Sequence, residues 1–209
     1  MARNFAEIAF TESVRALQEK AGSRRSYARM EAMARGSELT EAEIEFIAER
    51  DGFYLSTVGE SGFPYVQYRG GPKGFLKALD AKTLAFADFR GNMQYVSAGN
   101  LTRNDKAALI LMDYANRRRL KIYARIELVE ARQDPALIAR LRVPGDDAEI
   151  ERAMILRIEA FDWNCPQHIT PRFTIEEIRE MNAPLYEHLA RLEAEIERYK
   201  TESTEKRRP

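Results

Sequence analysis

The stretch LAFADFRGN, Leu84–Asn92, carries the most information about the fold of this chain. Six residues of mainly apolar, strand-forming character lead directly into Arg-Gly-Asn, a combination typical of a turn. Backbone N–H groups at such a turn are unpaired, and the end of a following helix is partly positive, so the turn can hold an anion. A second basic edge, Asn116–Arg119, opens another strand further along. Together the two edges predict a site for a phosphate-bearing cofactor that lies across strands.

Short strands precede and follow this stretch. Residues 53–58 and 64–69 are strand-like and are separated by the turn Gly59–Gly62, which predicts a hairpin. A short helix is expected over residues 93–101. The run 107–112 has no polar alternation, which predicts a strand covered on both faces. Residues 120–128 alternate and residues 154–161 are strand-like. Several short strands joined mostly by short turns favour an antiparallel barrel over a βαβ sheet.

The spacing of apolar residues changes from helical to strand-like and back, which divides the chain into three zones within one structural domain. Residues 1–50 form a helical N-terminal extension, in which Thr40 and Glu43 make a capping-box pattern. Residues 51–173 form the barrel domain, and residues 174–209 form a C-terminal helix with a frayed tail from Thr201. In that helix, apolar residues recur every three or four positions despite Pro184, and this stripe packs either on the barrel or on another subunit.

Composition excludes several classes of function. The 209 residues carry 33 basic and 33 acidic side chains, so no global field favours nucleic acid or a membrane surface. No run reaches the roughly 18 apolar residues of a membrane span, and no signal peptide is expected. The single cysteine, Cys165, allows no internal disulfide and fits a cytoplasmic protein. His168 and His188 have no partners at ligand spacing, so we predict no metal site.

The order of these motifs resembles the pyridoxamine 5′-phosphate oxidase-related, FMN-binding split-barrel proteins, and most closely the bacterial members whose substrate is undefined. The resemblance covers residues from about 50 to 175 and rests on an ordered set of stretches. These are PYVQYRGGP (64–72), LAFADFRGN (84–92) with Gln94 and Tyr95, MDYANRRRL (112–120) and FDWNCPQHITPR (161–172). It implies a six-stranded antiparallel split β-barrel with flanking helices, and a homodimer with FMN in the groove between subunits.

The resemblance also implies roles for fourteen residues. The strand along the flavin and its phosphate supplies Gln67, Tyr68, Arg69 and Gly70, and the flavin edge is met by Asp88 and Phe89. The phosphate loop corresponds to Arg90, Gly91 and Asn92. A side chain from the partner subunit corresponds to Arg118 or Arg119, and the segment that closes over the cofactor contains Trp163 and Gln167, with Arg172 near it. Arginine suits this task because it binds phosphate bidentately.

One departure bears on the reaction. The vitamin-B6 oxidases have Ser-Arg-Lys in the phosphate loop, where this chain has Asn92-Met93-Gln94. Two basic groups are therefore missing where the phosphates of cofactor and substrate would be neutralised. This argues against pyridoxamine phosphate as the substrate, and Arg90 can compensate for only one of the missing charges.

Several of these residues also have a purely structural interpretation. Arg69 fits a surface salt bridge, and Arg117–Arg119 fits a charged strand edge that discourages aggregation. Gly91 fits a simple turn, and Trp163 fits the core beneath the barrel. Cys165 follows no nucleophile signature and is expected to be inert.

Three functions remain open from the sequence. The first is an FMN-dependent oxidoreductase that acts on an unknown small molecule, with no catalytic side chain assigned. The second is a binding module for FMN, deazaflavin or haem without turnover, which the missing basic residues favour. The third is a structural or interaction protein on the same barrel, with the C-terminal helix as its working part.

Overall fold

The computed structural model describes residues 4–33, 37–143, 148–163 and 166–205, so Cys165 lies outside the described residues. The chain divides into two compact units. The first contains Met1–Asp113 and Arg117–His168, and the second contains Tyr114–Asn116 and Ile169–Pro209.

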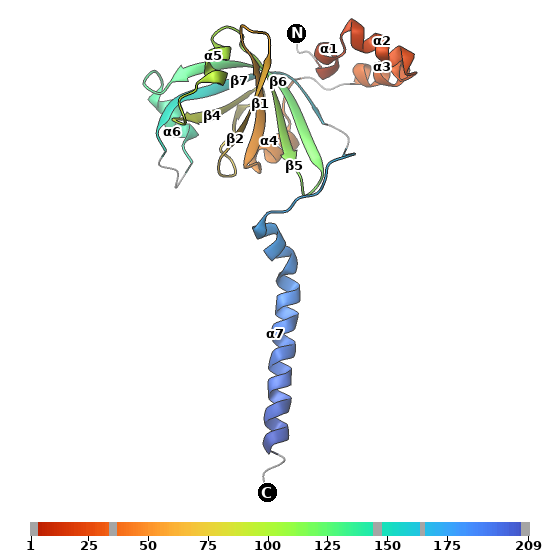
Figure 1. The fold of residues 1–209 in the computed structure, drawn as a ribbon, viewed down its shortest axis with the longest axis vertical. Coiled ribbons are helices and arrows are strands. Elements are labelled where there is room, and N and C mark those ends of the chain that lie inside the picture. The colour runs from red at the N-terminus through yellow and green to blue at the C-terminus, as the bar shows by residue number, and fades with distance from the viewer. Residues whose placement is uncertain (1–3, 34–36, 144–147, 164–165, 206–209) are drawn as a thin grey trace. The chain divides into compact units, whose positions relative to one another are not determined.

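An antiparallel sheet of seven strands forms the centre of the first unit (Figure 1). The strands are β1 Gly52–Val58, β2 Pro64–Gly70, β3 Lys77–Asp80, β4 Thr83–Phe89, β5 Lys106–Asp113, β6 Arg118–Glu130 and β7 Ile150–Trp163. Their order is β2-β1-β5-β6-β7-β4-β3, which leaves β2 and β3 at the edges of an open sheet. The predicted split-barrel class is confirmed, with seven strands instead of six. The additional strand is β3, whose four residues show no alternation in the sequence.

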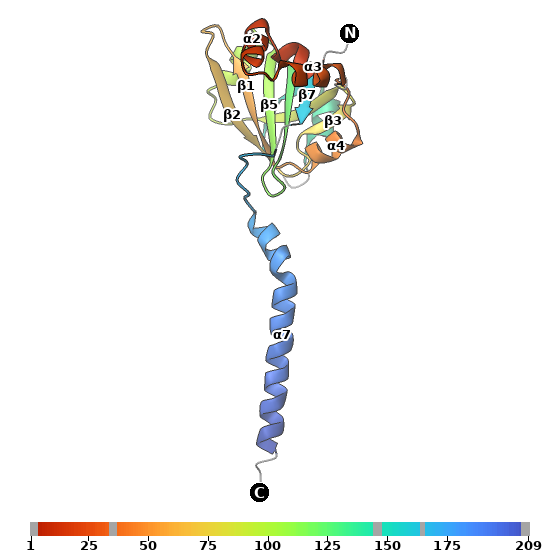
Figure 2. The same ribbon diagram turned by 90° about the vertical axis from the view of Figure 1, so that its right-hand side faces the viewer.

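The predicted hairpin is present, and it brings β2 beside β1 with Ser56 opposite Val66 (Figure 2). On the other side of β1, Tyr54 faces Ile110 of β5. The prediction for residues 107–112 is wrong in one respect, because β5 alternates between buried residues and residues that are partly or fully exposed. Leu109 and Leu111 enter the core, but Ile110 is 39% exposed on the opposite face. The run is apolar throughout, yet within one chain only one of its faces is covered.

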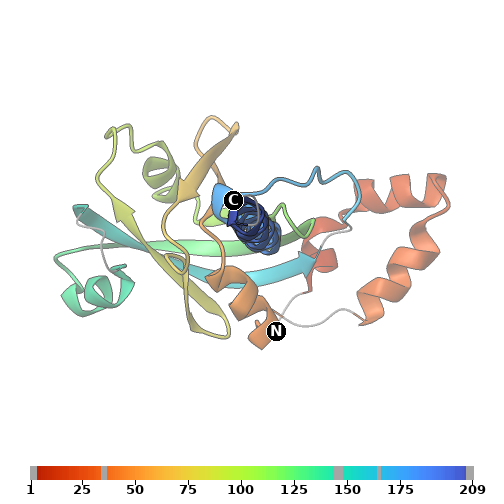
Figure 3. The same cartoon turned by 90° about the horizontal axis from the view of Figure 1, so that it is seen from below.

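The helices of the first unit lie around this sheet. They are α1 Phe5–Ala9, α2 Glu12–Lys20, α3 Arg24–Met33, α4 Glu41–Ala48, α5 Val96–Leu101 and α6 Pro135–Leu141. The capping-box pattern is present at α4, where the Glu43 carboxylate accepts hydrogen bonds from the Thr40 backbone N–H at 2.9 Å and from the Thr40 hydroxyl. The α6 helix begins at Pro135, with Asp134 as its N-cap, and lies at one end of the sheet (Figure 3).

The core lies on the inner face of the sheet. Three phenylalanine rings pack together at its centre, with Phe53 against Phe75 at 5.7 Å and against Phe86 at 5.3 Å between ring centroids. A second apolar cluster lies beneath α6, where Leu137, Ile138 and Leu141 are buried. These two clusters anchor β4, the strand that leads into Arg90, Gly91 and Asn92.

The second unit consists mainly of the helix α7, Ile175–Glu205. It continues past the predicted start of fraying at Thr201, and residues 206–209 lie outside the description. Among the described residues, no helix is both long and apolar enough to cross a membrane.

Candidate functional site

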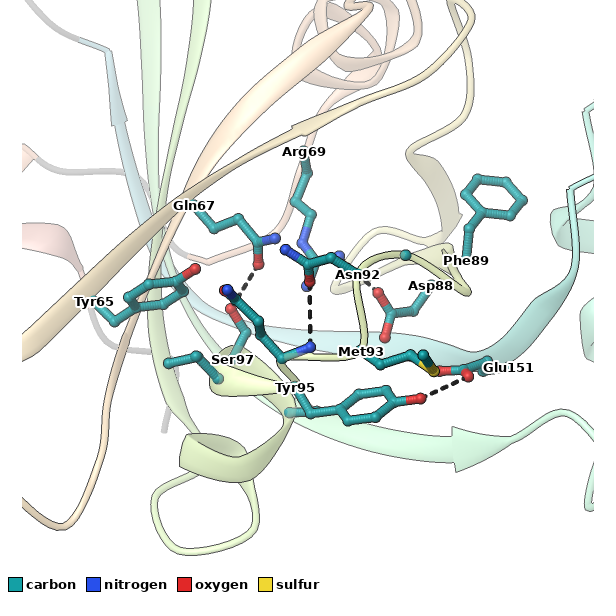
Figure 4. Close-up of a pocket in the computed structure, with 14 residues that line it drawn as sticks. Tyr65, Gln67, Arg69, Asp88, Phe89, Asn92, Met93, Tyr95, Ser97 and Glu151 are labelled. Atoms are coloured by element: carbon teal, nitrogen blue, oxygen red, sulfur yellow. Dashed lines mark hydrogen bonds and ion pairs between the residues drawn. The ribbon is translucent and has the colours of Figure 1, made fainter.

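Two strands that do not pair in the sheet, β2 and β4, aim polar side chains at the same small cleft (Figure 4). Because side chains alternate along a strand, Tyr65, Gln67 and Arg69 of β2 share one face. Asp88 stands near the end of β4 and is the last of six consecutive buried residues that begin at Thr83. The folding of β4 into the core therefore fixes the position of this carboxylate at the cleft.

An ion pair between the half-buried Arg69 and the buried Asp88 joins the two strands. The Nη1 atom of Arg69 lies 2.6 Å from Oδ1 of Asp88, and Arg152 of β7 approaches the other carboxylate oxygen at 3.6 Å. Burial raises the pKa of the Asp88 carboxyl above its usual range, although Arg69 and Arg152 act in the opposite direction. The Nε atoms of both arginines are buried and have no hydrogen-bond partner among the residues that the structure describes. The Nε of Arg152 lies 3.7 Å from the Glu130 carboxylate, so of the two arginines it is Arg69, which lines the cleft, that holds the unsatisfied donor.

The loop after β4 forms the next wall. Met93 and Tyr95 have positive φ angles of 58° and 50°, which non-glycine residues rarely adopt. The backbone N–H of Gln94 donates to Oδ1 of Asn92 at 3.2 Å, and the Tyr95 hydroxyl donates to Glu151 at 2.8 Å. That second hydrogen bond raises the pKa of the Tyr95 phenol. Strained backbone held by such contacts is typical of binding and active sites.

This loop also corrects a prediction. The helix expected from residue 93 begins only at Val96, because Met93 and Tyr95 are left-handed and interrupt the helical path. The resulting α5 helix has six residues, and its buried Ser97 donates a hydrogen bond to Gln67 at 3.0 Å. This contact ties α5 to β2 across the floor of the cleft.

The cleft has a volume of about 90 Å³. Six of the predicted residues line it: Gln67, Arg69, Asp88, Phe89, Gly91 and Asn92. The ring of Phe89 points away from the other labelled side chains in Figure 4. A Cβ atom added to Gly91 would meet nothing within 4 Å, so the backbone there is open to a ligand.

Sequence reasoning missed other residues at this site. Tyr65 could have been found, because it precedes Gln67 by one strand period. Glu151 and Arg152 carry no local signal, since they reach the site only through the pairing of Asp88 with Arg152 between β4 and β7.

Three predicted residues on the same segments lie outside the cleft lining. Tyr68 is on the opposite face of β2, where it packs against Tyr54 with ring centroids 5.4 Å apart. Gly70 ends β2, and a Cβ atom there would meet the Tyr68 ring at 2.9 Å. Arg90 is exposed and pairs with Glu149 at 3.1 Å.

A second group of predicted residues gathers at the other end of β7. The guanidinium of Arg118 lies 4.6 Å from the Trp163 ring and 5.1 Å from the Phe46 ring, and the Trp163 indole donates to Glu43 at 2.7 Å. Trp163 and Arg152 stand near opposite ends of β7, separated by roughly 36 Å if the strand were fully extended at 3.3 Å per residue. Within one chain, this group does not join the cleft.

The last three predicted residues are placed as follows. Arg119 is half-buried in β6 opposite Met112, and Gln167 is exposed in the segment after β7. Arg172 belongs to the second unit, where its guanidinium lies 5.0 Å from the ring of Tyr114. Among the described residues, no cluster of three or more His, Cys, Asp or Glu side chains is arranged to hold a metal ion.

Comparison with known proteins assigns the fold to a family. The sequence model of the pyridoxamine 5′-phosphate oxidase family matches residues 39–160, which is more than half of the 209-residue chain. The chain therefore belongs to the pyridoxamine 5′-phosphate oxidase family. The matched region contains β1 to β7 almost completely, together with every residue that lines the cleft.

Solved structures with a similar fold have low sequence identity. A protein related to general stress protein 26 from Clostridium acetobutylicum is 19% identical, with a TM-score of 0.44 over 66% of this chain and 94% of that one. An FMN-binding protein from Syntrophomonas wolfei is 13% identical, with a TM-score of 0.44 over 70% and 97% of the two chains. An F420 reductase is 23% identical, with a TM-score of 0.42 over 59% and 98%. No curated protein matches the chain.

Proposed function

We propose that this chain binds FMN in the Arg69 cleft, as a homodimer whose sites lie between subunits, and acts as an oxidoreductase on a small molecule. The observation that carries the proposal is the buried Nε of Arg69, which has no hydrogen-bond partner. Leaving such a donor unsatisfied costs about 1–3 kcal/mol, more when the group is charged. A phosphate group in the cleft would bind the Arg69 guanidinium, and a shift of the side chain would bring Nε within reach of a phosphate oxygen.

The other donors of the cleft suit the polar end of a flavin nucleotide. Gln67 and Asn92 carry amide groups, and the backbone at Gly91 is open. The Asp88 carboxylate offsets part of the charge of Arg69, so the cleft is suited to one phosphate and not to two. This balance agrees with the loss of the basic pair at residues 92–94 and argues against pyridoxamine phosphate as the substrate.

The size of the cleft supports a site completed by a second copy. About 90 Å³ is well below the roughly 300–1,000 Å³ of typical cofactor pockets. Further walls are needed, and within one chain Arg118 and Trp163 are at the other end of β7. A homodimer would bring these residues, and with them Arg119, Gln167 and Arg172, from one subunit to the cleft of the other.

The outer face of the sheet supports the same dimer. Exposed apolar residues of β2, β1 and β5 stand in adjacent register positions there, since Tyr54 pairs with both Tyr68 and Ile110. Tyr54, Val66, Tyr68 and Ile110 are between 39% and 59% exposed. A contiguous patch of this kind on a folded protein commonly marks an interface.

In this mechanism the bound flavin supplies hydride or electron transfer. The chain binds and orients: Arg69 neutralises the anion, Asp88 holds Arg69 in place, and the Tyr95–Glu151 hydrogen bond holds the loop. Because Asp88 and Glu151 are already engaged in these contacts, neither is assigned as an acid or a base.

The same engagement favours a second candidate function, a flavin-binding module without turnover. Four titratable side chains that line the cleft are paired with each other within the site, as Arg69 with Asp88 and Tyr95 with Glu151. Such a module would retain the cofactor but would not pass electrons to a substrate.

The absorbance spectrum of the purified protein, with the mass of any released cofactor, tests the proposal. We expect a yellow protein, as purified or after incubation with FMN, with deazaflavin and haem as competing ligands. A protein that stays colourless with FMN would overturn the proposal. Bound flavin that NADH, NADPH and chemical screening of small reductants all fail to reduce would instead favour the module without turnover.

A further inference from the structure

The helix α7 presents a long apolar stripe that no described residue of its own unit covers. Its large apolar side chains are between 42% and 64% exposed: Ile175, Ile178, Met181, Leu185, Leu189, Leu192, Ile196 and the phenol-bearing Tyr186 and Tyr199. An isolated helix in water is marginal, and most helical stability in proteins comes from packing an apolar face. A 31-residue helix with such a stripe is therefore expected to have a partner.

The spacing of the stripe identifies the kind of partner. When Ile175 is placed at heptad position a, the d positions are Ile178, Leu185, Leu192 and Tyr199, and further a positions are Leu189 and Ile196. This is a period of 3.5 residues sustained over the helix, the pattern of a coiled coil. Most flanking e and g positions are polar, as at Glu193 and Lys200, so the stripe is narrower than a helix packed on a globular surface requires.

We propose that α7 pairs with α7 of a second copy of this chain as a parallel, in-register, two-stranded coiled coil. This inference does not depend on the flavin, because it rests only on residues of α7.

A polar residue inside the seam favours the parallel arrangement. Asn182 occupies an a position and is half-buried, unlike its exposed neighbours. In a parallel in-register dimer the two Asn182 amides face each other and can hydrogen-bond. In an antiparallel dimer each would face an apolar d residue and lose its partner, which costs free energy.

The flanking positions are self-complementary in the same register. In a parallel coil, a g residue approaches the e residue five positions later on the other helix. The three pairs are then Met181 with Tyr186, His188 with Glu193, and Glu195 with Lys200. All three contacts are favourable. Met181 places a thioether against the Tyr186 ring, and the other two pairs each join a carboxylate to a hydrogen-bond donor.

Proline 184 is compatible with this arrangement. It is inside α7 and removes one helical hydrogen bond, but it falls at heptad position c, which faces solvent in a coiled coil. The carbonyl that it leaves without an intrahelical donor can bind water there. The seam residues from Leu185 to Tyr199 follow the proline without interruption.

Cysteine cross-linking in the full-length protein tests the orientation. In a Cys165→Ser background, Ser203→Cys places a thiol at an a position, and Ala194→Cys places one at the outward f position as a matched control. A parallel coil brings the two thiols introduced at position 203 together, so we expect a cross-linked dimer from S203C and none from A194C. Antiparallel helices would hold the S203C thiols about 40 Å apart. Absence of an S203C cross-link, or equal cross-linking of both variants, would overturn the proposal.

A seam variant separates pairing of α7 from folding and from the flavin site. In Leu185→Glu/Leu192→Glu, both d positions become charged, whereas Ala190→Glu/Ala194→Glu adds the same charge at outward positions. We expect the first variant alone to lose the S203C cross-link and part of the helical circular dichroism. Equal behaviour of the two variants, or a mass above that of a dimer, would contradict the proposal. Flavin absorbance is measured in parallel, so a colourless protein that still cross-links would refute the flavin proposal and leave this one standing.

Discussion

At the scale of single residues, Arg69 and Asp88 determine the chemistry of the cleft. Their ion pair spans two strands and is largely buried, and such pairs contribute to a defined geometry more than to net stability. Arg69 nevertheless keeps its Nε donor without a hydrogen bond. The pair thus holds the guanidinium in place while leaving part of its donor capacity for a ligand.

Replacing Arg69 tests this function of the guanidinium. We expect Arg69→Gln to weaken FMN binding by about 10- to 100-fold, because a hydrogen bond to a charged group contributes about 1.5–3 kcal/mol and 1.4 kcal/mol is tenfold in affinity. Titration monitored by flavin fluorescence measures the change. Arg103→Gln is the matched control, since Arg103 is exposed and pairs with Glu60 outside the cleft. Equal affinities for the two variants would refute a phosphate contact by Arg69.

Glu43 provides a second prediction at this scale. Burial acts to raise its pKa, but hydrogen bonds from Thr40 and Trp163 outweigh burial and hold the pKa below the usual value. The stability it contributes is complete above the unfolded-state pKa of about 4.3 and is lost as the pH falls through the lowered folded-state pKa. We expect Glu43→Gln to lower stability near neutral pH by about 1–2 kcal/mol and to flatten the acid branch of the stability curve.

Fluorescence measures this effect directly, because Trp163 is the single tryptophan of the chain. Thermal unfolding followed by tryptophan emission from pH 7 to pH 3 compares the wild type with Glu43→Gln. The control is Glu45→Gln, which changes an exposed residue of the same helix α4. If both variants follow the wild-type pH dependence, the contact between Glu43 and Trp163 does not stabilise the fold.

At the scale of elements, the outer face of the β2-β1-β5 region is the feature that one chain leaves incomplete. The apolar run of β5 predicted burial on both sides, yet Ile110 is exposed in the single chain. The apolar pattern of a strand predicts that both of its faces are buried, but it does not show whether the same chain or a partner subunit covers each face. We therefore place the partner subunit on the face of β5 where Ile110 is exposed.

Charging this face is expected to separate the subunits. In Ile110→Glu, a carboxylate would be buried against the apolar partner surface, and an isolated buried charge costs several kcal/mol. We expect sedimentation velocity to show dissociation of the barrel dimer and a loss of FMN affinity. Lys106→Glu changes an exposed position of the same strand and serves as the control. Because the proposed α7 coiled coil would hold two copies together independently, the measurement is also made in the Leu185→Glu/Leu192→Glu background.

At the scale of the whole molecule, stability is expected to be distributed unevenly over the sheet. The long strands β6 and β7 are at its centre and carry neighbours on both sides, whereas β2 and β3 have one free edge each in the order of strands. Central strands open only on global unfolding, and edges open locally. We expect amide hydrogen exchange to be slowest in β6 and β7 and fastest in β3, and uniform protection across the sheet would contradict this expectation.

The sequence predicts most of the elements because local signals specify them. The Thr40–Glu43 pattern marks the start of α4, the Asp134-Pro135 pair marks the start of α6, and the turn at residues 59–62 joins β1 to β2. The start of α5 was predicted three residues too early, since the left-handed residues Met93 and Tyr95 are not distinguishable from helix formers by composition.

The sequence by itself determined the family, the split-barrel class and the six cleft residues that lie on β2, β4 and the following loop, because period and turn chemistry are local properties of a chain. Strand alternation already places Tyr68 on the face of β2 opposite Gln67 and Arg69, but only the tertiary structure decided which of these faces meets β4. It also brought Glu151 and Arg152 to Asp88 by pairing β7 with β4. Strand register is a long-range choice made by the whole core, so no local pattern of residues could reveal it.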